Sequence, residues 1–417
     1  MLHQHLSHVF PDTADTDDAG HLTLGGCDTV QLAEQYGTPL YVLDEATLRN
    51  RCRQFSSAFA GSYPNTGVVY ASKAGINPAL VRIFTEEGLG LDVVSGGELA
   101  MAVSGEMPLD RVYFHGSNKS ASELEEAVSA GIGRIVVDNF HELDLLEQIC
   151  ANEGKRQDIL VRVCPGIDPH THAYTTTGII DSKFGFSIPT GDAERAILCA
   201  IAAPRLNLLG LHFHLGSPIF ELGPYTQAID LVLRFAAGLR EKGLNLQVFS
   251  PGGGFAIAYT RKDKPPSARD YADVIVSALT ATCEELHMEL PRLVVEPGRS
   301  IIGPAGVTLY RVGAIKTISR RPHVRQRGRR HKRQHSSGSL PGPGKCCESG
   351  DVLASGVELP APVAGDVIAV PATGAYSSSM ASNYNLNPRP PIVLVNERKS
   401  RLIRRRESYA DMMLCDL

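Results

Sequence analysis

Eight short strand-like runs alternate with helix-like stretches through the middle of this 417-residue chain. The runs fall near residues 67–71, 90–94, 111–115, 134–138, 158–163, 207–214, 245–249 and 292–296. Most are separated by about 10 to 20 residues with one apolar face, which is the pattern of strand–helix units. Eight such units predict an α/β fold, a (β/α)8 barrel of the TIM type. A doubly wound open sheet is the alternative.

Local signals mark where several helices begin. Asp44 precedes a helix-like stretch, and Asn77 stands directly before Pro78 at a first helical position. Ser120 and Glu123 have the spacing of a capping box. Each signal marks the end of the loop that joins a strand to the following helix, and functional residues are expected in these loops.

The pattern changes after residue 300, where short alternating runs are separated by turn residues. These runs are residues 307–310, 365–370, 392–395 and 401–403. They predict a second, mostly antiparallel β domain, a β-sandwich or β-barrel. Residues 1 to 39 carry no strong periodicity, whereas 40–43 are typical of a strand. We therefore expect an amino-terminal segment (1–43) that contributes to the β domain, a barrel (44–303) and a carboxyl-terminal β domain (304–417).

The composition is that of an ordinary globular protein, with 43% hydrophobic and 21% charged residues. A formal net charge of −4 gives no general attraction to nucleic acid or to anionic membranes. No apolar run approaches membrane-spanning length, and the first residues lack a signal-peptide pattern, so we expect a cytoplasmic protein. Nine cysteines, an odd and dilute set, indicate reduced thiols.

Polar residues follow each predicted barrel strand, at the end where such barrels place their chemistry. They are Lys73, Asp92, Ser95, His115, Asn118, Asp138, Arg162, His214, Gly216, Ser217, Gly252 to Gly254, Glu296 and Arg299. Any one of them alone is more simply explained as a helix cap or a core residue. Their convergence on one mouth predicts an active site.

Three of these features fit one cofactor. A lysine at a strand end, largely stripped of water, is easier to keep neutral, and a neutral amine forms a Schiff base with an aldehyde. Gly252, Gly253 and Gly254 leave backbone N–H groups free to wrap a phosphate, with Ser217 and Tyr376 as further donors. Glu296 can hold a proton on a pyridine nitrogen. Together they predict a pyridoxal-phosphate site. Taken one by one, the three features have simpler alternatives: a surface lysine, a glycine turn and a Glu296–Arg299 ion pair.

Six motifs in order carry a family resemblance. They are Tyr70-Ala71-Ser72-Lys73-Ala74, His214-Leu215-Gly216-Ser217, Gly252-Gly253-Gly254-Phe255, Glu296-Pro297-Gly298-Arg299, Cys347-Glu348-Ser349-Gly350-Asp351 and Gly374-Ala375-Tyr376. The chain resembles the barrel-fold (type III) pyridoxal-phosphate decarboxylases and, among these, the diaminopimelate decarboxylases. The resemblance covers nearly the whole chain from about residue 30. It implies decarboxylation of meso-2,6-diaminopimelate to L-lysine, the last step of lysine biosynthesis.

The resemblance also implies residue roles. Lys73 would bond the aldehyde, His214 would stack on the cofactor ring and Glu296 would hold the pyridinium nitrogen. Phosphate binding would fall to Ser217, Gly252, Gly253, Gly254, Gly298, Arg299 and Tyr376, with Arg299 and Tyr376 also contacting substrate. Pro218 stands where the family has glutamine.

In this family two subunits share each active site, which implies a homodimer. Cys347 would reach across to reprotonate the carbanion left by loss of carbon dioxide, and a thiol of near-neutral pKa suits that task. Glu348 would bind the distal amino group of the substrate. Decarboxylation of ornithine, arginine or carboxynorspermidine, amino-acid racemisation and a non-catalytic homologue remain alternatives.

One segment departs from the family. No acidic residue lies between Glu296 and Glu348, and the run from Arg320 to His335 is strongly basic. Taken literally, it is a solvated arm that binds nucleic acid. The family instead has a strand close to Val-Asp-Gly-Gly-x-x-Asp-Asn-Ile-Arg-Pro, and the codons of 327–338 permit that strand when read one base later. We therefore interpret residues 321–342 as an out-of-frame segment, with neighbouring residues deleted.

Overall fold

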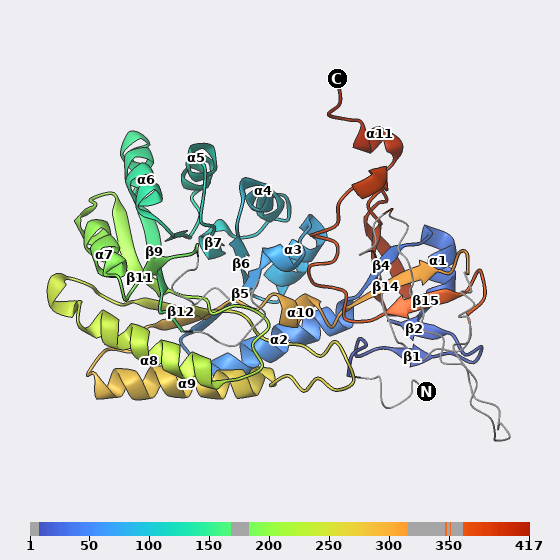
Figure 1. Cartoon of the computed structure of the whole chain (residues 1–417), viewed down its shortest axis with the longest axis horizontal. Coiled ribbons are helices and arrows are strands. Elements are labelled where there is room, and N and C mark those ends of the chain that lie inside the picture. Colours follow the sequence, from blue (N-terminus) through green and yellow to red (C-terminus); the bar gives the residue numbers. More distant parts are fainter. Residues whose placement is uncertain (1–7, 168–182, 316–346, 348–350, 352–361) are drawn as a thin grey trace, which may run out of the picture.

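The computed structural model describes residues 8–167, 183–315, 347, 351 and 362–417. Eight parallel strands close into a barrel because β13 pairs with β5 and β8 pairs with β9 (Figure 1). The strands are β5 (Thr66–Ala71), β6 (Gly90–Val93), β7 (Val112–Phe114), β8 (Arg134–Val137), β9 (Gln157–Cys164), β11 (Leu206–His212), β12 (Val248–Gly252) and β13 (Arg292–Val295). The predicted barrel is confirmed and the open sheet is wrong.

The seventh strand lies further along the chain than its sequence predicted. β12 spans Val248–Gly252, whereas residues 245–249 were expected. Leu244 and Leu246 lie in the connection before the strand and are buried there. Because they are apolar, they made the predicted strand begin too early in the sequence. The shift makes Gly252 the last residue of β12. A short strand, β10 (Phe186–Ser187), adds to the edge of β9.

Helices cover the outside of the barrel and begin where the sequence signals place them. They are α2 (Glu45–Ser62), α3 (Pro78–Glu86), α4 (Gly96–Ser104), α5 (Ala121–Ala130), α6 (Phe140–Asn152), α7 (Asp192–Ala202), α8 (Gly223–Ala237) and α9 (Ala268–Glu285). The Asp44 carboxylate accepts from the Thr47 N–H at 2.7 Å, and Asn77 caps α3. The Ser120–Glu123 capping box is present. Among the described residues, no helix has both the length and the apolarity to cross a bilayer.

A five-stranded sheet forms the second domain, in the order β15, β14, β4, β16, β17. Its strands are β4 (Leu40–Asp44), β14 (Gly306–Arg311), β15 (Val367–Val370), β16 (Ile392–Asn396) and β17 (Lys399–Arg404). All pairings are antiparallel except β16 with β4. A strand from the amino-terminal part therefore lies at the centre of this sheet.

The amino-terminal part also contains elements that its sequence did not reveal. They are β1 (Asp15–Thr16), β2 (Leu22–Leu24), β3 (Cys27–Asp28) and α1 (Thr29–Tyr36). Two- and three-residue strands are too short to establish a period. Leu24 and Leu32 are buried against the five-stranded sheet, so the segment covers one face of it.

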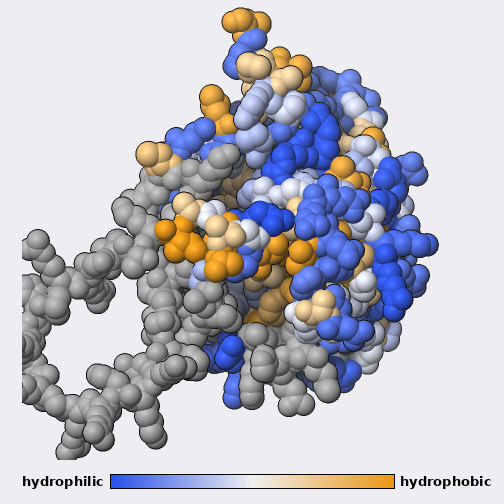
Figure 2. All heavy atoms as spheres, turned by 90° about the vertical axis from the view of Figure 1, so that its right-hand side faces the viewer, coloured by the Kyte–Doolittle hydropathy of each residue, from blue (hydrophilic) through white to orange (hydrophobic). Residues whose placement is uncertain are grey.

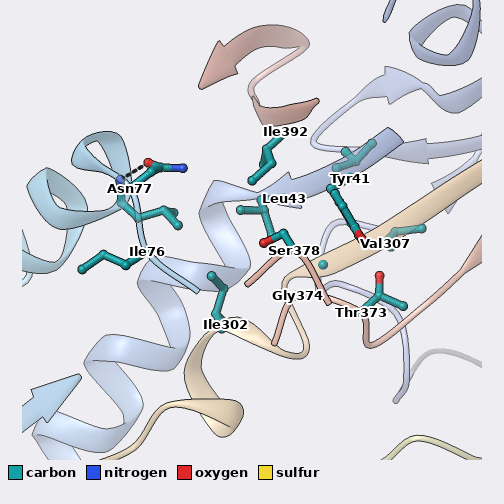
Figure 3. Close-up of a pocket in the computed structure, with 13 residues that line it drawn as sticks. Tyr41, Leu43, Ile76, Asn77, Ile302, Val307, Thr373, Gly374, Ser378 and Ile392 are labelled. Atoms are coloured by element: carbon teal, nitrogen blue, oxygen red, sulfur yellow. Dashed lines mark hydrogen bonds between the residues drawn. The ribbon is translucent and has the colours of Figure 1, made fainter. Parts of the chain in front are cut away.

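The two domains meet at a tight apolar junction (Figure 3). Tyr41 and Leu43 of β4, Ile392 of β16 and Ile302 of the short helix α10 (Arg299–Ile302) line it. The space between them is about 10 Å³, roughly the volume of one water, and too small for a substrate. This junction therefore fixes the β domain against the barrel.

A buried ion pair anchors the loop between β7 and α5. The Lys119 ammonium donates to Glu142 at 2.7 Å and to the carbonyls of Gly116 and Val136 at 2.8 and 2.9 Å. Both charged residues are buried. The pair ties this loop of the barrel mouth to β8 and α6.

Replacing Lys119→Met should lower the free energy of unfolding by about 3–5 kcal/mol, because it leaves the Glu142 carboxylate buried without a partner. The double variant with Glu142→Met should recover part of this loss. Lys155→Met removes a half-exposed pair with Glu153 and should cost about 0–1 kcal/mol. Urea unfolding measures all three; equal losses for Lys119→Met and Lys155→Met would contradict the assignment.

Candidate active site

Lys73 lies just past the end of β5, in the single 3₁₀ turn η1 (Ser72–Ala74). It therefore stands at the same end of the barrel as Glu296, which follows β13 beside β5. The expectation that this lysine is largely stripped of water is wrong, because the residue is exposed. The chain leaves the strand before Lys73, and the side chain therefore stands at the rim.

Glu296 follows β13 and is buried beneath this rim. Its Oε1 accepts from the Ser250 hydroxyl at 2.9 Å, and its Oε2 lies 3.1 Å from His212 Nε2. His115 Nε2 lies 3.5 Å from Oε1. Burial alone would raise the pKa of Glu296, but the hydrogen bond that Oε2 accepts from the His212 imidazole stabilises the charged form and holds the pKa below its ordinary value. Glu296 is therefore ionised at neutral pH.

Asp92 of β6 is the second buried carboxyl group of the mouth. Burial raises its pKa to about 8, and the charge of Glu296 adds to the effect while Lys73 opposes it. One of the two carboxyls is thus neutral near pH 7 and the other is charged. Environments that separate two such groups are typical of active sites.

The glycine loop after β12 packs directly against the residues around it. Gly252 and Gly254 have φ of +73° and +106°, values that residues with a side chain rarely adopt. A Cβ at Gly253 would lie 2.0 Å from the Glu296 carbonyl oxygen. The Gly253 N–H donates to His214 Nδ1 at 3.3 Å. The loop therefore brings its backbone beside His214, while the Gly252 N–H donates to the Ser250 hydroxyl at 3.2 Å.

Arg299 stands at the start of α10 beside this loop. Its Nε donates to the Ser217 hydroxyl at 3.2 Å, and a second nitrogen donates to the Tyr259 hydroxyl. Its guanidinium carbon lies 4.6 Å from the centre of the Tyr376 ring. Arg299 thus gathers three hydroxyl-bearing side chains, and the predicted alternative, a pair with Glu296, is replaced by these contacts.

The loop that carries Tyr376 belongs to the β domain and is anchored on the barrel. The Tyr376 N–H donates to the Ala74 carbonyl at 2.7 Å, and the Ser379 hydroxyl donates to the Lys73 carbonyl at 3.1 Å. Tyr376 has φ of +62°, a conformation that costs energy in a non-glycine residue and recurs at functional sites. Gly298 lies against Ala71, where a Cβ would approach the Ala71 Cβ to 3.0 Å.

Two further residues were predicted to act on the substrate from a second subunit, Cys347 and Glu348, and only Cys347 is among the described residues. Cys347 is exposed, and its N–H donates to the Asn385 side chain of the β domain at 2.7 Å. Glu348 and the segment 321–342 lie outside the described residues. Their predicted roles stay predictions.

Sequence reasoning missed three residues of the site: His212, Ser250 and Tyr259. A signal for His212 was present, because it precedes His214 by two residues within the predicted strand 207–214, and alternate strand residues point to the same side. Ser250 stands two residues before Gly252 in β12, and the same rule applies. Tyr259 lies in a connection and carries no comparable signal.

Comparison with known proteins identifies the class of this site. Residues 45–303 match the family model of the pyridoxal binding domain of pyridoxal-dependent decarboxylases. The barrel is thus the pyridoxal-binding domain of that class.

Individual relatives narrow the class further. The chain is 41% identical to a diaminopimelate decarboxylase of Bacillus subtilis over 97% of each chain, and 42% identical to that of Halalkalibacterium halodurans over 98% of each. The crystal structure of diaminopimelate decarboxylase from M. jannaschii in complex with L-lysine superposes with a TM-score of 0.86, at 31% identity. It covers 97% of this chain, and the match covers 98% of that one. The chain belongs to the diaminopimelate decarboxylase family.

Gly253→Ala should weaken binding of pyridoxal phosphate and lower the free energy of unfolding by at least about 1–3 kcal/mol, because the new Cβ displaces the Glu296 backbone. Gly223→Ala is the matched control, since a Cβ there meets nothing within 4 Å. Cofactor titration and urea unfolding measure both variants. Normal cofactor binding by Gly253→Ala would show that the close approach is not needed.

The pKa of Asp92 predicts a pH dependence of stability in the cofactor-free protein. Its folded pKa of about 8 lies above the ordinary 3.8, so folding favours the protonated form and stability falls as pH rises from about 4 to about 8. Asp92→Asn should flatten this fall, whose slope reaches at most about 1.4 kcal/mol per pH unit. Urea unfolding at several pH values tests it. The exposed Asp144→Asn should leave the profile unchanged; an unchanged profile in Asp92→Asn would refute the assignment.

Proposed function

We propose that this protein removes one carboxylate of meso-2,6-diaminopimelate as carbon dioxide and leaves L-lysine, with pyridoxal 5'-phosphate as cofactor. The main observation behind this proposal is that Lys73, the glycine loop and the ionised Glu296 lie at the same mouth of the barrel. Identity of about 41% to curated diaminopimelate decarboxylases over nearly the whole chain supports this substrate over ornithine, arginine or carboxynorspermidine.

The residues present fit the cofactor. Gly253 and Gly254 leave no room for a Cβ, so the loop backbone forms a close-fitting cradle, and Arg299 with Ser217 supplies charge and hydroxyl donors beside it. When bound, pyridoxal phosphate supplies an aldehyde for an amine and an electron-withdrawing ring that stabilises a carbanion. The anionic Glu296 suits a protonated ring nitrogen.

Each residue then has a task. Lys73 would hold the cofactor aldehyde, His214 would pack on the ring, and Glu296 would keep a proton on the ring nitrogen. The residues that would hold the phosphate are Ser217, Gly252, Gly253, Gly254, Gly298, Arg299 and Tyr376. The Gly253 N–H bond to His214 Nδ1 supports the stacking role, because it fixes one edge of the imidazole beside the cradle.

The substrate side depends on a second subunit in this proposal. Cys347 of one protomer would return a proton to the carbanion, Glu348 would bind the distal amino group, and Arg299 and Tyr376 would contact substrate. Figure 2 shows apolar side chains on the face that the β domain presents. The exposed Met380, Leu386 and Met413 belong to this part of the chain, and burial of such residues favours a homodimer.

The domain division 1–43, 44–303 and 304–417 fits this arrangement. β4 is a central strand of the β-domain sheet, and the matched cofactor domain begins at residue 45. In this proposal the barrel binds the cofactor, and the β domain completes the substrate side of the active site.

The basic segment favours a second candidate, a homologue that binds cofactor without efficient decarboxylation. The family strand expected there supplies an arginine and a tyrosine for a substrate carboxylate, so an out-of-frame 321–342 would impair substrate binding. The alignment with the Bacillus subtilis relative spans 434 positions although this chain has 417 residues, so this chain lacks residues that the relative has. Resequencing the gene across these codons decides the frame.

Lys73→Ala should abolish the absorbance band of the bound cofactor and reduce carbon dioxide release from diaminopimelate by several orders of magnitude, because the amine that holds the aldehyde is lost. Lys242→Ala, an exposed lysine just before β12 at the opposite end of the barrel, should retain both. Borohydride should fix label on Lys73 alone. Assays with diaminopimelate, ornithine and arginine test the substrate.

The same variant tests the shared site. Mixing Lys73→Ala with Cys347→Ala protomers should restore part of the activity when subunits exchange, since some mixed dimers then contain one intact site. A cofactor band that shifts with diaminopimelate, but without carbon dioxide release in the unaltered protein, would favour the non-catalytic homologue.

A further inference from the structure

We propose that His212 and Ser250 are positioning residues that hold Glu296 as a charged, fixed acceptor for the protonated ring nitrogen of the cofactor. This inference rests on the proposed pyridoxal-phosphate site. It gives a role to two buried side chains, one in β11 and one in β12, that have no role in the cofactor and substrate contacts proposed above.

The geometry fixes the direction of both hydrogen bonds. Ser250 Oγ donates to Oε1 at 2.9 Å, and the Gly252 N–H donates to the same Oγ at 3.2 Å, so the hydroxyl proton points to Glu296. His212 Nε2 lies 3.1 Å from Oε2. A carboxylate only accepts hydrogen bonds, so Nε2 carries the proton.

The same geometry shows that His212 is neutral. Among the residues that the structure describes, its buried Nδ1 has no hydrogen-bond partner, so a proton there would be a buried donor with no acceptor. Burial accordingly lowers the pKa of His212. The ring is held by packing instead, edge-on against His115 with centroids 4.8 Å apart at 71°.

Neutral donors orient a carboxylate without cancelling its charge. Ser250 and neutral His212 use one acceptor position on each oxygen of Glu296, while the nearby Arg299 is engaged by the hydroxyls of Ser217 and Tyr259. Glu296 therefore retains a full negative charge in a buried site. A cationic N–H group in the barrel mouth is the chemical partner that such a charge favours most strongly.

A transition metal is the competing occupant. His115, His212 and Glu296 offer two imidazoles and a carboxylate with ligand atoms within 4.8 Å of one another. The hydrogen bond from His212 Nε2 to Glu296 Oε2 argues against a metal. Nε2 would have to lose its proton, and with it this hydrogen bond, before it could bind a metal. Zinc is therefore included as a probe.

The test compares two cofactors in the full-length protein: pyridoxal phosphate and its 1-deaza analogue, which lacks the ring nitrogen. His212→Leu should weaken binding of pyridoxal phosphate by about 10- to 100-fold, the value of one hydrogen bond to a charged group. It should leave binding of the analogue unchanged within error. His212→Gln, which retains an N–H donor, should recover most of the affinity.

Ser250→Ala should show the same selective loss, and it carries the test if His212→Leu fails to fold. His141→Leu, an exposed histidine of α6, is the matched control. Equal losses for both cofactors would overturn the inference, because a merely structural role affects them alike. So would stoichiometric zinc binding by the cofactor-free protein that His212→Leu abolishes. An unaltered protein that binds neither cofactor would instead refute the proposed function itself.

Discussion

Closure of the parallel sheet by the pairing of β13 with β5 is the constraint on which the rest of this molecule depends. Leu293 pairs with Thr66 and Val295 with Val68, so the last strand of the barrel lies beside the first. The Ala71 N–H then donates to the Pro297 carbonyl at 3.1 Å, which continues the contact past the end of both strands. Lys73 and Glu296, distant in sequence, consequently stand at one mouth.

The polar interior of that mouth has an energetic cost that the surrounding packing offsets. Glu296, Asp92 and His212 are buried, and an isolated buried charge is strongly unfavourable. The structure limits this cost by charging one carboxyl group, keeping the other neutral and surrounding both with neutral imidazoles. A cation that enters the mouth is therefore stabilised by a field already in place, and no side chain must reorganise to receive it.

Much of this arrangement is predictable from sequence because it follows local rules. Asn77 with Pro78, and Ser120 with Glu123, define helix starts through contacts within one turn, and both signals match the structure. The pairing of Tyr376 with the barrel depends on two segments far apart in the chain, and no local pattern predicts it. His212 was overlooked because reasoning placed function after strands, whereas a buried group can also act from inside one. Lys73 proved exposed because side-chain burial depends on where the chain leaves its strand.

Most of the proposed cofactor contacts and the proposed contacts of Cys347 and Glu348 with substrate come from different parts of this chain, so an altered segment can affect one set more than the other. Of the proposed cofactor contacts, all but Tyr376 come from the barrel, whose strands contribute to two apolar clusters, a large one shared with the surrounding helices and a small one formed by strand residues. The basic run from Arg320 to His335 falls between β14 and β15 in the chain, within the β-domain part. The barrel closes through its own strand pairings, without any pairing to β14 or β15. The proposed cofactor contacts thus lie on elements that do not include the basic run, whereas the proposed substrate contacts Cys347 and Glu348 belong to the domain that contains it.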